Sequence, residues 1–160
     1  MLSAIPVFYS QKMVADVNSF SPSTGKPEFV VESWRGLGIP LAVQDVEPAS
    51  NELLCLAHNP DYVKRIFAGQ EINGFKNKRV DLAETCRYTV AGMRDAGMEA
   101  LRNGRVAVAP VAGFHHARYA KSAGFCTFNG LIIAARALKN AGRANSIGIV
   151  DCDFHYGDGT

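Results

Sequence analysis

Apolar residues are distributed along this chain in the pattern of alternating strands and helices. A first strand is predicted at residues 5–9. The segment 19–27, rich in Ser, Pro, Gly and Thr, is expected to form an irregular loop after it. Two short helices are predicted at 48–58 and 59–69, because each begins with a Ser or Asn cap followed by an acidic residue in the first turn.

The second half of the chain contains the clearest periodic patterns. A long helix is predicted at 81–103, where apolar residues recur at helical spacing and Gly104 follows as a stop signal. The apolar run at 106–110 has no polar alternation, which indicates a strand covered on both faces. A helix at 129–140 and an apolar strand at 147–150 follow. Strand, helix and strand in this order predict a right-handed βαβ unit.

These elements together predict an α/β fold, with a mostly parallel sheet and helices on both of its faces. A buried parallel strand needs neighbouring strands and covering helices, and no residues follow Thr160 to supply them on the far side. We therefore expect the chain to be the first part of a larger unit, or to be completed by another chain.

Composition agrees with a globular protein. The 160 residues are 48% hydrophobic and 20% charged, enough for a single domain at roughly 100–200 residues per domain. The net charge of +2 and the absence of a basic run argue against direct binding of nucleic acid. No apolar stretch approaches the roughly 20 residues that span a bilayer, and residues 1–10 lack the features of a signal peptide. We expect a cytoplasmic protein that does not bind membranes.

The four cysteines are scattered at Cys55, Cys86, Cys126 and Cys152, with no Cys-x-x-Cys pair. In a chain of this size they are expected to be free buried thiols in a reducing compartment. A cysteine nucleophile is not favoured, because no cysteine has an obvious His partner or basic setting.

The candidate chemistry follows the two predicted strands of the second half. His115 and His116 follow the first of them, and Asp151, Asp153 and His155 follow the second, at the strand ends where α/β folds collect their ligands. In an extended segment the last three would project to one side. A carboxylate and an imidazole two residues apart suit zinc, but a catalytic zinc site usually has three protein ligands. The alternatives are a solvated loop at 151–158, and one surface histidine beside a core one.

Pairing of the tandem histidines with the aspartates of the second motif would give both a function. A carboxylate fixes the tautomer of a histidine and tunes its pKa, and Asp151 and Asp158 are two carboxylates beyond the one that a metal needs. His115 and His116 could then meet two aspartates beside a metal-bound water.

The order and spacing of these residues resemble the signature of the histone deacetylase superfamily. The matching blocks are 113–117 (Gly-Phe-His-His-Ala), 124–126 (Gly-Phe-Cys) with Asn129, and 151–159 (Asp-x-Asp-x-His-x-Gly-Asp-Gly). The superfamily includes acetylpolyamine amidohydrolases and acetoin-utilization proteins. The resemblance implies an arginase/deacetylase-like three-layer sandwich, of which residues 1–160 would be the amino-terminal part, with the carboxyl-terminal part absent.

The resemblance also implies a role for each motif residue. Asp153 and His155 would be two zinc ligands, and Gly124 and Phe125 would line the channel for the alkyl stem of the substrate. Asp151, with main-chain carbonyls of Asp153 and His155, resembles a monovalent cation site that usually holds potassium.

The tandem histidines would act on the reacting groups. His115 would be hydrogen-bonded to Asp151 and His116 to Asp158, with one histidine as the general base. The implied reaction is hydrolysis of an acyl amide, on a small acylated amine or an acetylated lysine peptide. A homo-oligomer is compatible with this assignment.

Several features depart from the family pattern. The third zinc ligand and the tyrosine that stabilises the oxyanion have no counterpart here, Tyr156 stands where many members have a second histidine, and 111–114 replaces the usual Pro-Gly-Gly type of segment. Residues 21–24 stand where members have a His-Pro-Glu signature. These differences favour a divergent bacterial member. The alternatives are a truncated, non-catalytic homologue that binds a metal or a partner, and an arginase-type manganese hydrolase.

Overall fold

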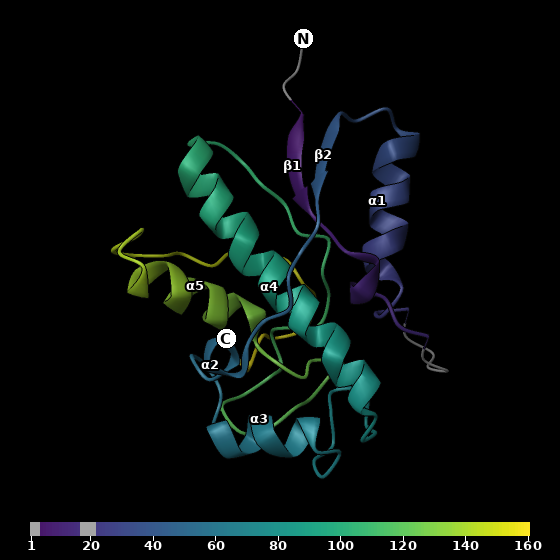
Figure 1. Ribbon diagram of the computed structural model, residues 1–160, viewed down its shortest axis with the longest axis vertical. Helices are drawn as coiled ribbons and strands as arrows, with labels where there is room; N and C mark the ends of the chain where they lie inside the picture. Colours follow the sequence, from purple (N-terminus) through teal and green to yellow (C-terminus); the bar gives the residue numbers. More distant parts are fainter. Residues whose placement is uncertain (1–3, 17–21) are drawn as a thin grey trace.

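The computed structural model describes residues 4–16 and 22–160, and its described elements are arranged as an α/β fold (Figure 1). In chain order the elements are β1 (Ile5–Phe8), η1 (Gln11–Met13), α1 (Lys26–Gly36), β2 (Leu41–Gln44), α2 (Asn51–Leu54), α3 (Pro60–Phe67), α4 (Val80–Asn103) and α5 (Gly130–Asn140). The α/β fold and the parallel sheet are thus as predicted.

The sheet is built on β1, which pairs in parallel with β2 in the register Ile5 to Leu41. The helix α1 makes the crossover between them. On its other side β1 pairs with Val108: the Phe8 amide donates to the Val108 carbonyl at 2.9 Å, and the Val108 amide donates to the Pro6 carbonyl at 3.0 Å. The order of parallel segments is therefore β2, β1 and the segment around Val108.

The two strands predicted in the second half of the chain do not form as expected. Residues 106–110 run beside β1 but pair with it only at Val108, and Val106 is 55% exposed rather than covered. Residues 147–150 are extended and exposed, and they form no backbone hydrogen bond to another described residue. An apolar run becomes a strand only where a partner strand meets its backbone groups, and none of the described segments does so at 147–150.

The helices predicted at 59–69, 81–103 and 129–140 are confirmed, whereas the one predicted at 48–58 is only the four-residue α2. The caps of α2 and α3 have the expected chemistry. The Ser50 hydroxyl accepts the Leu53 amide, and the Asn59 side chain accepts the amides of Asp61 and Tyr62. The long helix α4 ends at Gly104, whose φ of 66° is the left-handed conformation that glycine adopts most readily.

The predicted loop at 19–27 is only partly described, because residues 19–21 lie outside the described ranges. The described remainder is a turn that leads directly into α1 at Lys26, so the helix begins within the segment predicted as a loop. Neither α1 nor β2 was predicted. Only Pro27 and Val31 of α1 are buried, and β2 has four residues, so neither gives a strong periodic signal.

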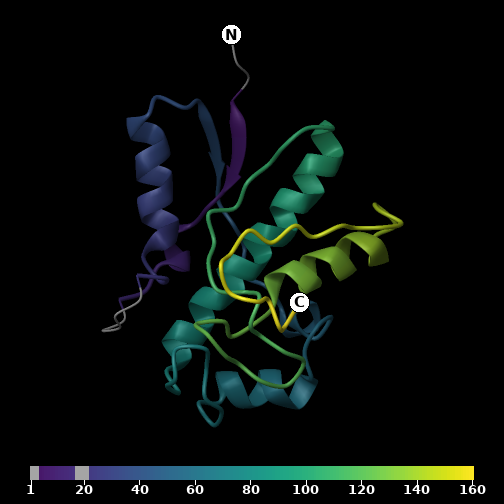
Figure 2. The ribbon, with the colours of Figure 1, turned by 180° about the vertical axis from the view of Figure 1, so that it is seen from behind.

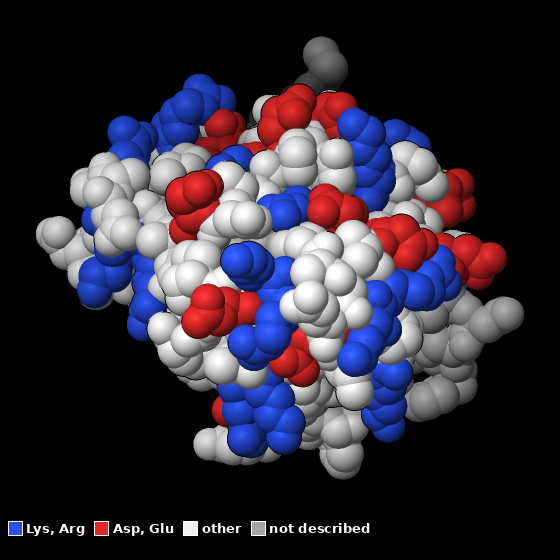
Figure 3. Space-filling view, turned by 60° about the horizontal axis from the view of Figure 1, so that its bottom comes forward, with Lys and Arg blue, Asp and Glu red and all other residues white. Residues whose placement is uncertain are grey.

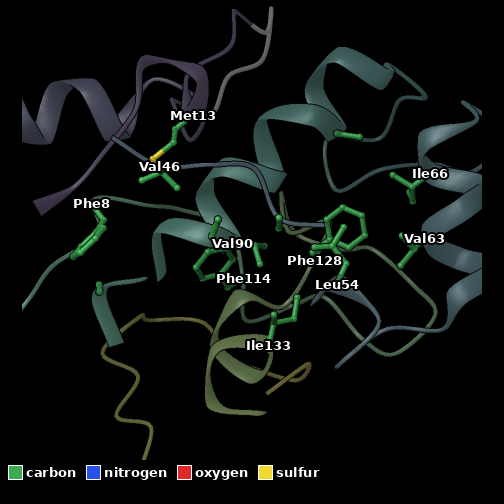
Figure 4. Close-up of a cluster of buried hydrophobic side chains, with 14 of the residues drawn as sticks. Phe8, Met13, Val46, Leu54, Val63, Ile66, Val90, Phe114, Phe128 and Ile133 are labelled. Carbon is green, nitrogen blue, oxygen red and sulfur yellow. The ribbon is translucent and has the colours of Figure 1, made fainter. Parts of the chain in front are cut away.

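The core lies between α4 and the helices that pack against it, and Figure 4 shows its central side chains. The buried cluster combines Val90 of α4 with aromatic and aliphatic residues of β1, α2, α3 and α5. The central residues are Phe8, Met13, Val46, Leu54, Val63, Ile66, Phe114, Phe128 and Ile133. Phe114 and Phe128 belong to the loops around the tandem histidines, so this core anchors those loops.

None of the described helices is long and apolar enough to cross a membrane. At the end of the molecule formed by α3, basic and acidic side chains are interspersed on the face shown in Figure 3.

Candidate active site

The tandem histidines and the carboxyl-terminal motif meet although they are far apart in the sequence. Figure 2 shows the last segment of the chain running across the molecule from the end of α5, with its terminus back near that helix. There the Gly159 amide donates to the His115 carbonyl at 2.7 Å. An added Cβ at Gly159 would lie 2.4 Å from the Ala117 carbonyl oxygen, so the two backbones approach this closely only because residue 159 is glycine.

The first histidine forms the predicted pair with Asp151. His115 Nδ1 lies 2.8 Å from Asp151 Oδ2, and the imidazole is largely buried, with 12% of its side chain exposed. The other carboxylate oxygen, Asp151 Oδ1, accepts the Asp153 amide at 3.0 Å. This backbone hydrogen bond and the one from His115 lower the pKa of Asp151. Because the carboxylate is ionised at neutral pH, the proton between the two groups belongs to Nδ1 of His115.

The second histidine forms the predicted pair with Asp158. His116 Nδ1 lies 2.8 Å from Asp158 Oδ1, while the Arg118 guanidinium donates to Asp158 Oδ2. Hydrogen bonds from His116 and Arg118 lower the pKa of Asp158 to about 2. The two imidazole rings lie side by side, with their centroids 4.1 Å apart. Both histidines are therefore held with Nδ1 protonated, which leaves Nε2 able to accept a proton.

Asp153 and His155 lie in the same loop and face one another. Asp153 Oδ1 accepts the His155 amide at 2.7 Å and lies 2.9 Å from His155 Nδ1. The amide bond and the imidazole contact lower the pKa of Asp153. His155 is 70% exposed at its side chain, and its ring centroid lies 6.0 Å from that of His116. Asp151, Asp153 and His155 line one cleft, as predicted, although residues 154–155 form a bend and the segment is not extended throughout.

The donor atoms of Asp153 and His155 are of types that zinc accepts. In this structure they contact each other, with Asp153 Oδ1 2.9 Å from His155 Nδ1. Two ligands are also fewer than the three protein ligands of a usual catalytic zinc site. Within residues 4–16 and 22–160, no group of three or more His, Cys, Asp or Glu side chains is arranged to hold a metal ion.

A cleft of about 630 Å³ joins these groups to an apolar wall. Its apolar lining includes Met93, Ala109, Val111 and Leu131, and the polar lining includes both histidines, Asp151, Asp153 and His155. The two predicted channel residues, Gly124 and Phe125, also line it. Gly124 has a φ of 50°, and an added Cβ would lie 2.3 Å from the His116 ring, so glycine is required beside this histidine.

Two residues near the site were not singled out from the sequence. Arg118 shares Asp158 with His116, and the fully buried His58 bonds to the backbone of both Arg118 and Asn129. No local pattern marks either residue, because both contacts join segments that are distant in the sequence. Asn129, in contrast, was part of the family resemblance in the sequence, and its side chain caps α5.

All four cysteines are free of disulfides, as predicted. Cys126 is buried, Cys55 and Cys86 are half-buried, and Cys152 is exposed, so the expectation of four buried thiols is wrong for Cys152. Burial raises the pKa of Cys86 and of Cys126 to about 11. Both thiols are protonated at neutral pH, which makes them poor nucleophiles.

Comparison with known proteins finds the same relationship over most of the chain. The family model of the histone deacetylase domain matches residues 25–160. The chain is 35% identical over 111 residues to an uncharacterized protein of Picosynechococcus sp. (66% of this chain, 36% of that protein). It is 34% identical over 140 residues to polyamine deacetylase HDAC10 of Rattus norvegicus (78% of this chain, 24% of that protein).

A solved structure shows the same fold. The crystal structure of the HDA15 HD domain superposes with a TM-score of 0.81 at 19% identity, covering 98% of this chain and 49% of that one. The chain thus spans about half of this solved domain and about a quarter to a third of the two relatives named above. The match over 25–160 includes both histidine–aspartate pairs and the Asp153–His155 loop, and the chain belongs to the histone deacetylase domain family.

Proposed function

We propose that this chain provides the proton-transferring groups and two metal ligands of a zinc-dependent deacylase, which hydrolyses an acyl amide on an amine such as acetylated lysine or a polyamine. The observation that supports this most is the convergence of two histidine–aspartate pairs on the cleft that also contains Asp153 and His155. In this proposal residues 1–160 are the amino-terminal part of a single deacetylase-like domain.

Asp153 and His155 would hold the zinc ion, with a third ligand supplied from outside the described residues. Zinc, when bound, lowers the pKa of a coordinated water and polarises an amide carbonyl. A potassium ion at Asp151 and the carbonyls of Asp153 and His155 would stiffen the same loop.

The chain's own residues would move the protons. Nε2 of one tandem histidine accepts a proton from the attacking water as the oxygen–carbon bond forms, and the proton then passes to the leaving amine as the carbon–nitrogen bond breaks. Ionised Asp151 and Asp158 stabilise the imidazolium that exists between these steps. The apolar wall of the cleft would exclude water around the acyl group and the alkyl stem.

The test is release of acetate from an acetyl-lysine peptide and from N-acetylputrescine by the zinc-loaded complete domain, of which this chain is the proposed amino-terminal part. We expect release that depends on zinc and is reduced about 100-fold or more in His116→Ala, the usual size of a general-base contribution. Lys121→Ala changes an exposed residue of the same loop and should leave the rate unchanged. Equal rates in wild type and His116→Ala would contradict the assignment.

A second candidate is a non-catalytic homologue that binds a metal or a partner. This candidate is favoured because the described residues offer only two zinc ligands, Asp153 and His155. A complete domain that holds zinc at Asp153 and His155 but releases no acetate from either substrate would support this candidate over the first.

A further inference from the structure

His58 is a fully buried histidine outside the cleft, and its two ring nitrogens bond to two different loops. It lies between α2 and α3 with 0% of its surface exposed, packed against the rings of Tyr62 and Phe128. Its Nδ1 lies 3.0 Å from the Arg118 carbonyl, and its Nε2 accepts the Asn129 amide at 2.8 Å. Because a carbonyl can only accept and an amide can only donate, the ring is neutral with the proton on Nδ1.

The Nδ1 bond holds the loop that contains the tandem histidines. Arg118 is two residues after His116, and the next residue is held as well, since the Asn59 amide donates to the Tyr119 carbonyl at 2.9 Å. The connection between α2 and α3 therefore fixes the backbone that follows His116.

The Nε2 bond extends to the loop that contains Asp158, through Asn129. The Asn129 side chain is 2% exposed, and its Nδ2 donates to the carbonyl of Gly159 at 2.9 Å and to that of Ala117 at 3.3 Å. Its Oδ1 accepts the Ile132 amide in the first turn of α5. One asparagine thus connects both loops to the start of α5, and His58 holds that asparagine by its backbone.

We infer that His58, acting through Arg118 and Asn129, is a positioning residue that sets the distance between His116 and Asp158. This inference rests on the proposed function for its importance to catalysis, but the contact itself can be measured without zinc or substrate. A neutral imidazole suits the position because it offers one donor and one acceptor on a rigid ring, and the two backbone groups that it meets require one of each.

The test is the NMR signal of the His116 Nδ1 proton, which is shifted downfield and slowed in exchange when it is bonded to a carboxylate. The variant His58→Phe keeps a ring of similar size but removes both nitrogens. Tyr62→Phe is the matched control, because it removes a buried hydrogen bond to the Thr127 carbonyl from the same cluster. Signals are assigned with His115→Gln and His116→Gln.

We expect the His116 signal to be lost or to exchange at least tenfold faster in His58→Phe and to persist in Tyr62→Phe. Asn129→Asp provides a second measurement if His58→Phe does not fold, since aspartate keeps the cap on α5 but cannot donate to Gly159. It should also weaken the His116 signal.

A His116 signal unchanged in His58→Phe or in folded Asn129→Asp would overturn the inference, and so would an equal loss in Tyr62→Phe. Failure of the proposed function gives a different result: the signals respond as expected, but no acetate is released.

Discussion

Asp151 and Asp158 hold their histidines in the same tautomer by different means. Asp151 is fixed by the backbone amide of its own loop, whereas Asp158 is fixed by the Arg118 guanidinium. The placement of Asp151, Asp153 and His155 on one cleft was predictable from their spacing. The contribution of Arg118 was not, because it depends on a loop 40 residues earlier in the chain coming alongside Asp158.

The buried His58 gives a prediction for the pH dependence of stability. Burial lowers its pKa from 6.5 to about 4. Between these values the unfolded chain binds a proton that the folded chain does not, so the free energy of unfolding falls as pH decreases through this range. The contribution is fully present above about pH 6.5. A shift of this size corresponds to at most roughly 3 kcal/mol.

Urea unfolding at pH 7.5 and pH 4.5 measures this effect in wild type and His58→Gln. The loss of stability between the two pH values should be smaller in the variant by up to roughly 3 kcal/mol. The difference between the two proteins removes the contribution of other titrating groups. Equal losses would show that His58 is already protonated, or accessible to water, in the folded chain.

At the level of secondary structure, the sequence predicted helices better than strands. The helices α2 and α3 have local caps, and α4 has a long apolar period with a glycine stop, so each is specified by residues within it. Strand pairing depends instead on segments distant in the sequence. The apolar segment 147–150 resembles a strand in its composition, but no described segment meets its backbone.

The loop at 124–126 can be tested by mutation, because the backbone of Gly124 passes directly against the His116 ring. Gly124→Ala should destabilise the chain and displace the ring, since its Cβ would lie 2.3 Å from the imidazole. Gly142→Ala is a matched control: its φ of 65° is also left-handed, but nothing lies within 4 Å of its added Cβ. Both variants incur the backbone cost of about 1 kcal/mol for alanine at positive φ.

Only Gly124→Ala has the additional steric clash. In urea unfolding we expect it to lose about 1–3 kcal/mol more than Gly142→Ala, in the range for overpacked positions. The His116 Nδ1 proton signal should change in Gly124→Ala alone. Equal losses of stability in the two variants would mean that the His116 ring has room to move.

For the whole molecule, the site depends on bringing two loops together over one core. The motif resemblance predicted which residues would lie together, and the structure brings His115 beside Asp151 and His116 beside Asp158. The sequence did not predict that His58 and Asn129 connect the two loops by hydrogen bonds. A buried polar side chain between two loops leaves no periodic signal in the sequence. The apolar strand predicted at 147–150 also differs from expectation, because Val150 is 89% exposed. Phe154 and Tyr156, in the loop that follows, are 98% and 87% exposed.

We propose a zinc site at Asp153 and His155 beside the two histidine–aspartate pairs, and zinc affinity measured by competition with a chromophoric chelator shows whether these two residues hold the ion. Asp81→Ala is the control, because Asp81 is an exposed aspartate paired with Arg79 on α4 and distant in sequence from the cleft motifs. We predict that Asp153→Ala weakens zinc binding by about tenfold or more while Asp81→Ala leaves it unchanged. Unchanged affinity in Asp153→Ala, or an equal loss in Asp81→Ala, would show that zinc does not bind at Asp153 and His155.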